Sequence, residues 1–192
     1  MLRSTLGALL AVGLLAGVAQ AQDEGEIMVI EVAGEANGTV EIQLLPEIAP
    51  QHVERLTTLA REGAYDGVVF HRVIDGFMAQ TGDVEFGTQE AFSGGQAGMG
   101  GSSYPDLPAE FSDVPFEKGV VGMARAQNPD SANSQFFIMF DEGAFLNGQY
   151  TVVGKVIEGQ DVVDAIKRGG GRNGTVSSEP DVMQDVYIKG EG

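Results

Sequence analysis

Residues 70–83 read FHRVIDGFMAQTGD. This stretch holds one cation, Arg72, among large apolar side chains such as Phe70 and Phe77, and the amide of Gln80 follows near its end. A cation and an amide set in an apolar stretch are typical of a small-ligand or peptide site, which is mostly apolar with a few aimed polar groups. The same residues also fit an edge strand whose outward side chains happen to be Arg and Gln. This stretch alone leaves both interpretations open.

The residues around this stretch predict many short strands and only two helices. Strands are expected at 27–32, 39–45, 68–73, 77–80, 119–124, 135–140, 150–157 and 182–188, from their β-branched or alternating apolar residues. Helical spacing of apolar residues predicts helices at 50–62 and 160–167, and 93–106 is a loop rich in glycine, serine and proline. This pattern indicates one mainly β domain, either a barrel or a sandwich.

The first 21 residues resemble a secretion signal. Arg3 precedes an apolar run at 6–18, and Ala19-Gln20-Ala21 is the small-x-small pattern that precedes cleavage. The run is too short to cross a hydrocarbon core of about 30 Å, so we expect cleavage after Ala21 and no stable membrane insertion afterwards. Residues 22–26 read as a flexible acidic lead-in, and the folded domain is expected at 27–192. The simple signal and the lack of cysteine suggest a bacterial protein exported to the periplasm.

Composition narrows the range of functions. A formal net charge of −17 over 192 residues repels nucleic acid and favours solubility. The chain has no cysteine and only two histidines, His52 and His71, which lie far apart in sequence, so no metal site is expected. His52, in the first predicted helix, is expected to be solvated. No cofactor is expected, because no lysine follows the glycines of 93–106 as a phosphate-binding loop requires.

Two later segments complete the pattern that begins at residue 70. They read GVVGMARAQNPDSANSQFFIMF at 119–140 and FLNGQYTVVGKVIEG at 145–159. Together with FHRVIDGFMAQTGD, their order and spacing resemble the cyclophilin family of peptidyl-prolyl isomerases over essentially the whole chain after residue 38. The resemblance implies a closed eight-stranded antiparallel β-barrel capped by two α-helices, with the substrate groove on the outside of the barrel. It also implies an enzyme that isomerises X-Pro bonds in exported proteins during folding, as a monomer acting on proline-containing polypeptides.

The resemblance also implies roles for particular residues. Arg72, Phe77 and Gln80 are expected to be catalytic, with Arg72 donating to the proline nitrogen of a twisted amide. Substrate binding is expected from His71, Met78, Gly98, Ala124, Arg125, Gln135, Phe137, Phe145, Leu146 and Tyr150. Arg125 is expected to act mostly through its backbone, and His71 as a structural or rim residue rather than a general base. The alternative for Phe137 and Leu146 is a purely structural role in the core, and Gln135 alternatively only supports a loop.

Some positions depart from the family pattern. Phe145 stands where many eukaryotic relatives have Trp, Tyr150 where they have His, and Arg125 where Asn is common. Because Phe145 lacks an indole donor, strong cyclosporin binding is not expected. The alternative function is a binding module or holdase chaperone that holds proline peptides with little turnover, and retention of Arg72 favours the enzyme.

Overall fold

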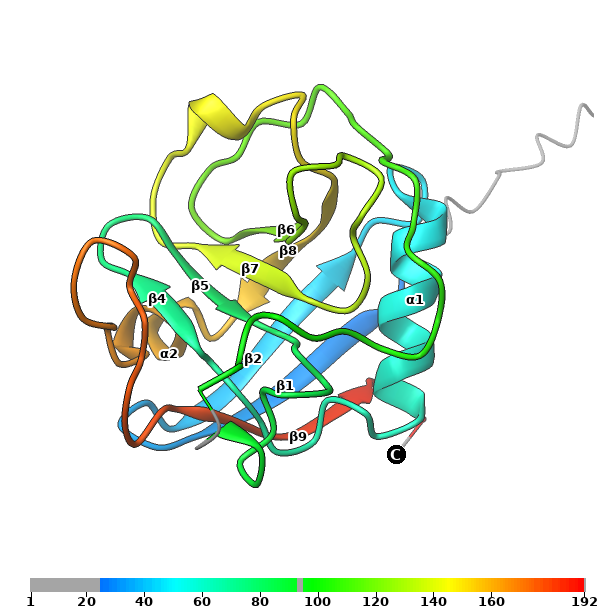
Figure 1. Ribbon diagram of the computed structural model, residues 1–192. Coiled ribbons are helices and arrows are strands. Elements are labelled where there is room, and N and C mark those ends of the chain that lie inside the picture. The colour runs from blue at the N-terminus through cyan, green and yellow to red at the C-terminus, as the bar shows by residue number, and fades with distance from the viewer. Residues whose placement is uncertain (1–24, 93–94, 192) are drawn as a thin grey trace, which may run out of the picture.

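An antiparallel sheet of nine strands forms the body of the computed structural model, which describes residues 25–92 and 95–191 (Figure 1). The strands are β1 (Ile27–Ala33), β2 (Gly38–Leu44), β3 (Val68–Val69), β4 (Arg72–Ile74), β5 (Met78–Thr81), β6 (Val120–Met123), β7 (Phe136–Met139), β8 (Val152–Glu158) and β9 (Val182–Ile188). Their order across the sheet is β3-β9-β1-β2-β8-β6-β7-β5-β4. The signal predicted at 1–21 and most of the lead-in at 22–26 lie outside the described residues.

Both predicted helices are present, and each forms for the reason that the sequence indicated. Helix α1 (Pro50–Arg61) begins at a proline, which suits a first turn, and turns its apolar stripe, including Leu56 and Leu59, into the core. The chain leaves the helix at Gly63, whose φ of +66° is the left-handed conformation that glycine adopts easily. Helix α2 (Gln160–Ala165) is shorter, and a 3-10 turn occupies Ala144–Leu146. Figure 1 shows α1 standing along one side of the sheet.

The expectation of a closed eight-stranded barrel is wrong in its details. The sheet has nine strands and curls into an open half-barrel whose edges are β3 and β4, which follow each other in the chain. The two edges are not paired with each other. Instead, the segment 169–176 bonds to β4 and the residue before it: Gly169 N donates to Val73 O at 2.9 Å, and Val176 N donates to His71 O at 3.0 Å.

The composition of that segment explains the open edge. Residues 169–174 read GGGRNG, which favours turns over a regular strand. A Cβ on Gly169 would stand 1.9 Å from Gly174 O, so the backbone folds against itself more closely than a side chain allows. A glycine-rich turn therefore covers the β4 edge, which would pair with β3 in a closed barrel.

The apolar side chains form two clusters. The larger cluster lies between the sheet and α1 and contains Tyr65, Phe70 and Phe136 among its largest members. The smaller cluster, called here the smaller core, contains Met78, Phe116, Val120, Phe137, Met139, Leu146 and Val152. Because its residues come from β5, β6, β7, β8 and the 3-10 turn, this end of the sheet has its own apolar support. Within the described part of the chain, no helix has the length and apolar character needed to cross a membrane.

Candidate functional site

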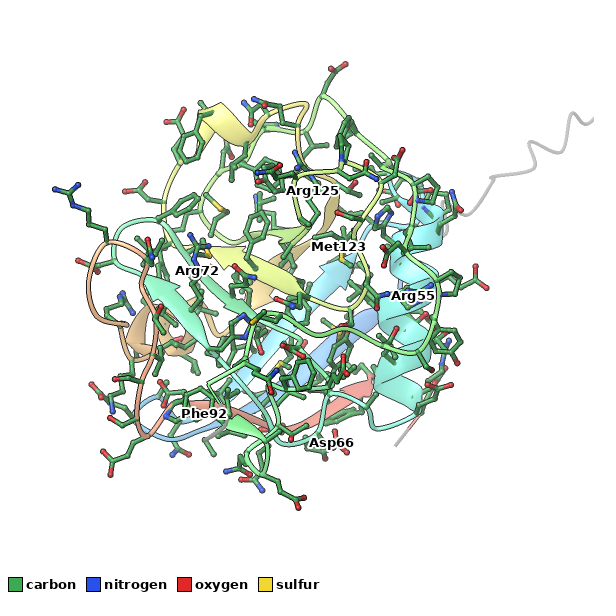
Figure 2. All side chains as sticks on the ribbon, viewed as in Figure 1. Arg55, Asp66, Arg72, Phe92, Met123 and Arg125 are labelled. Carbon is green, nitrogen blue, oxygen red and sulfur yellow. The ribbon has the colours of Figure 1, made fainter. Side chains whose placement is uncertain are left out.

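The β4–β5 hairpin places Arg72 directly opposite Gln80. The two residues are cross-strand partners, and Arg72 Nη1 donates to Gln80 Oε1 at 3.0 Å. β4 is indeed an edge strand, and Arg72 also lines a hollow in the surface, so the two interpretations of this stretch are compatible. Figure 2 shows the Arg72 side chain beside this hairpin.

A chain of hydrogen bonds orients the Arg72 guanidinium. Gln80 Nε2 donates to Gln135 Oε1 at 2.9 Å, and Gln135 Nε2 donates to Gly100 O at 2.8 Å. On its other side Arg72 Nε donates to Asn173 O at 3.0 Å. Burial lowers the pKa of Arg72, and the neighbouring Tyr150 acts in the opposite direction; the side chain still carries its charge near neutrality. The guanidinium is therefore a positively charged donor held in a defined direction.

The hollow beside Arg72, called here the first hollow, has a volume of about 390 Å³. Its lining consists of Arg72, Phe77, Met78, Gln80, Ala124, Arg125, Phe137, Phe145, Leu146, Gln149 and Tyr150. Met78, Phe137 and Leu146 are buried members of the smaller core and also line the hollow. Phe137 and Leu146 therefore have both of the roles that the sequence left as alternatives, a structural role in the core and a place in the lining of the site. The Phe77 and Phe145 rings pack with centroids 5.3 Å apart. The first hollow thus combines buried apolar side chains with two arginines and two glutamine amides.

A second hollow of about 360 Å³ adjoins the first and shares Gln80, Ala124 and Arg125 with it. Gly98 and Gln135 line this second hollow. The buried carboxylate of Asp83 holds its loop, because Oδ2 accepts from Gly98 N at 2.7 Å and from Gly100 N at 3.0 Å. The three shared residues place the two hollows side by side on the surface.

His71 lines neither hollow. It is buried behind the loop, where a Cβ on Gly98 would lie 3.1 Å from its Nε2. Neither ring nitrogen has a hydrogen-bond partner within residues 25–92 and 95–191. Burial lowers the pKa of His71, although the nearby Asp83 acts against that shift. The ring is therefore neutral near pH 7 and supports the loop from behind rather than standing at the rim.

The expectation that His52 is solvated is wrong. His52 is fully buried, and its Nδ1 lies 2.6 Å from Glu110 Oε2. Glu110 also accepts from the backbone N–H groups of Gln51 and His52 at 3.2 and 3.1 Å. Glu110 thus caps the first turn of α1, where the residue before the helix, Ala49, provides no side-chain cap. Helical spacing could not reveal this partner, because it lies 58 residues away in sequence.

The structure brings together all of the predicted site residues except His71 on the two hollows. It also adds lining residues that the sequence patterns did not single out. Gln149 lines the first hollow, while Met99, Asp106 and Asn133 line the second. The position of Gln149 between Leu146 and Tyr150 was the one signal available for it. In the described part of the chain, no three His, Asp or Glu side chains gather as a metal site requires.

Comparisons with known proteins show what this chain is similar to. The sequence profile of the family described as "Cyclophilin type peptidyl-prolyl cis-trans isomerase/CLD" matches residues 27–190. A probable peptidyl-prolyl cis-trans isomerase of Brucella suis biovar 1 is 54% identical over 99% of this chain and 97% of its own length. Peptidyl-prolyl cis-trans isomerase B of Bacillus subtilis is 36% identical over 81% of this chain and 94% of its own length.

Solved structures resemble the fold. The crystal structure of cyclophilin AquaCyp293 from Hirschia baltica has a TM-score of 0.70 and 28% identity, and the match covers 86% of this chain and 74% of that one. A cyclophilin-type isomerase from Cryptosporidium parvum, crystallised in the presence of the dipeptide Ala-Pro, has a TM-score of 0.71. It is 23% identical, with coverage of 86% of this chain and 99% of that one, so it supports the fold alone.

Proposed function

The chain belongs to the cyclophilin family and is a cyclophilin-type peptidyl-prolyl cis-trans isomerase. We propose that it isomerises X-Pro bonds in exported polypeptides, without a covalent step or a metal ion. Rotation about an X-Pro bond is opposed by a barrier of about 18–20 kcal/mol, because the amide is conjugated. In the twisted amide that conjugation is lost, and the proline nitrogen becomes basic. A donor aimed at this nitrogen therefore stabilises the twisted form more than the planar one, which is the condition for catalysis.

The placement of Arg72 carries this proposal. Its Nε and Nη1 are held by Asn173 O and Gln80 Oε1, while Nη2 has no hydrogen-bond partner within the described residues. The held donors fix the plane of the guanidinium, and the remaining donors stand at the wall of the first hollow. A proline ring in that hollow would have an arginine N–H group available to its nitrogen.

The magnitudes show that Arg72 does not act alone. A hydrogen bond to a charged group contributes about 1.5–3 kcal/mol net, whereas a millionfold acceleration requires about 8 kcal/mol. The apolar floor formed by Met78, Phe137 and Leu146 is suited to supply part of the remainder. It would grip the ring and exclude the water that otherwise stabilises the planar, more polar amide.

An Arg72→Ala variant tests the proposed mechanism. We expect kcat/KM for an Ala-Ala-Pro-Phe peptide to fall about 10- to 100-fold, as the loss of one charged hydrogen bond predicts, with the fold unchanged by circular dichroism. Arg172→Ala is the matched control, because Arg172 is an exposed arginine that lines neither hollow. Full activity in Arg72→Ala would contradict the mechanism. A parent protein that binds the peptide without exchanging its isomers by NMR would instead support the binding-module alternative.

The exported setting is the second part of the proposal. It is supported by the charged start, apolar run and Ala19-Gln20-Ala21 pattern of the first 21 residues. Proline isomerisation takes about 10–100 s without a catalyst, so newly exported chains with X-Pro bonds are plausible clients on kinetic grounds. We therefore place the isomerase in the periplasm, acting as a monomer on proline-containing polypeptides while they fold.

A further inference from the structure

Arg125 lies at the junction of the two hollows and contributes to the lining of both. It follows β6 on the chain, and Figure 2 shows it on the same side of the molecule as Arg72. Among the described residues no carboxylate lies within ion-pairing distance of Arg125, whereas Arg61, Lys118 and Arg168 each pair with at least one. The arginine at this position therefore does not serve an ion pair.

The Arg125 guanidinium instead ties two loops together. Its Nη1 donates to Ala126 O at 2.9 Å on its own loop. Its Nη2 donates to Gln149 O at 2.9 Å, on the segment that precedes β8. Ala124 on the first loop and Gln149 on the second both line the first hollow. The side chain is thus a crosslink between two walls of that hollow.

The same guanidinium also stacks on Tyr150. Its central carbon lies 4.4 Å from the centroid of the Tyr150 ring. The Tyr150 ring in turn meets the Phe137 ring edge to face, at a centroid distance of 5.9 Å. Arg125, Tyr150 and Phe137 therefore form a continuous stack from the junction of the hollows to the floor of the first one. Arg125 is the outermost layer of this stack and holds Tyr150 against Phe137.

We propose that Arg125 is a positioning residue, which fixes the Tyr150 wall of the first hollow so that the floor and Arg72 act on the same proline. The inference rests on the proposed function and deepens it. It requires the planar fork of arginine, because a guanidinium can donate to two carbonyl groups while its face covers an aromatic ring. A lysine ammonium is a compact point charge and cannot do both at once.

The test combines Arg125→Gln, Arg125→Lys and Tyr150→Leu. We expect each single variant to lower kcat/KM for the Ala-Ala-Pro-Phe peptide about tenfold, the size of one desolvated cation–π contact, and to weaken peptide binding by NMR titration. Arg125→Lys should fail to restore activity although it keeps the charge. In the Tyr150→Leu background, Arg125→Gln should cost less than threefold further, because the stack is already lost.

A control variant separates positioning from a general structural role. Arg168→Gln removes another stacked arginine, which lies 4.1 Å from the Phe140 ring and lines neither hollow, and it should leave kcat/KM unchanged. Arg125 variants that lose thermal stability but keep parental activity and affinity would overturn the inference while leaving the proposed function intact. An inactive parent would overturn the proposed function, and the peptide affinities would still decide the role of Arg125.

Discussion

At the scale of single residues, the floor of the first hollow depends on a glycine that does not itself line the hollow. A Cβ on Gly122 would stand 2.6 Å from the rings of both Phe116 and Phe137, which stack at a centroid distance of 5.7 Å. Real Cβ atoms do not come this close to ring atoms, so one ring must move. Because Phe137 is part of the floor, an overpacked Gly122 should change the shape of the hollow as well as the stability of the core.

We therefore expect Gly122→Ala to lower the free energy of unfolding by about 1–3 kcal/mol, the usual cost of overpacking, and to reduce kcat/KM. Urea denaturation and the peptide assay measure the two effects. Gly170→Ala is the matched control, because a Cβ there meets nothing within 4 Å and the residue lines neither hollow. If Gly122→Ala had parental stability, the packing of Phe116 and Phe137 would have to be looser than described.

At the scale of elements, α1 depends on a carboxylate from a distant segment. Glu110 accepts hydrogen bonds at the first turn of the helix and from the buried His52 ring. Burial alone would raise the pKa of Glu110, but the hydrogen bonds from His52 and Gln51 outweigh burial and hold the pKa below its ordinary value. A carboxylate at a helix N-terminus is also favoured by the helix dipole.

We expect Glu110→Gln to lower the free energy of unfolding by about 1–3 kcal/mol at neutral pH. The pKa is depressed in the folded state, so the stabilisation by Glu110 is complete above its unfolded pKa and is lost as the pH falls through the folded pKa. The difference between parent and variant should therefore be constant above about pH 5 and shrink below the ordinary carboxyl value of about 4.5. Thermal unfolding between pH 3 and pH 7 measures it. Glu54→Gln, an exposed change on the same helix, is the control and should show little effect at any pH. If the difference in stability between the parent and Glu110→Gln were the same at all pH values, the charged cap would be contradicted.

At the scale of the whole molecule, the two edge strands of the sheet, β3 and β4, are consecutive in the chain and are joined by a short link. Residues 70 and 71 carry the chain from β3 to β4, and the glycine-rich turn at 169–174 covers the β4 edge. This arrangement satisfies backbone groups of the edge strand while the Arg72 side chain still lines the first hollow. An exposed edge would otherwise be a site for aggregation.

A prediction about export also belongs to the scale of the whole chain. We expect the protein expressed in a Gram-negative bacterium to be recovered in the periplasmic fraction with Gln22 as its first residue, because the pattern at 19–21 precedes that position. N-terminal sequencing of the purified protein measures this. An Ala21→Arg variant, which removes the small residue before the cleavage point, should accumulate as the longer precursor. Recovery of the unprocessed parent chain from the cytoplasm would contradict the prediction.

Much of the fold and the site followed from the sequence because the deciding signals are local. Alternating apolar residues, Pro50 and Gly63 placed α1 and most strands within one or two residues, but the single strand predicted at 68–73 is two strands, β3 and β4, at opposite edges of the sheet. The predicted site included ten of the eleven residues that line the first hollow, whereas most of the loop residues that line the second were not predicted. Tertiary structure alone decided three further features: the open edge of the sheet, the burial of His52 against Glu110, and the stack of Arg125 on Tyr150. Each joins segments that are distant in the chain or that pack in an irregular loop, and residue spacing along one element carries no information about such contacts.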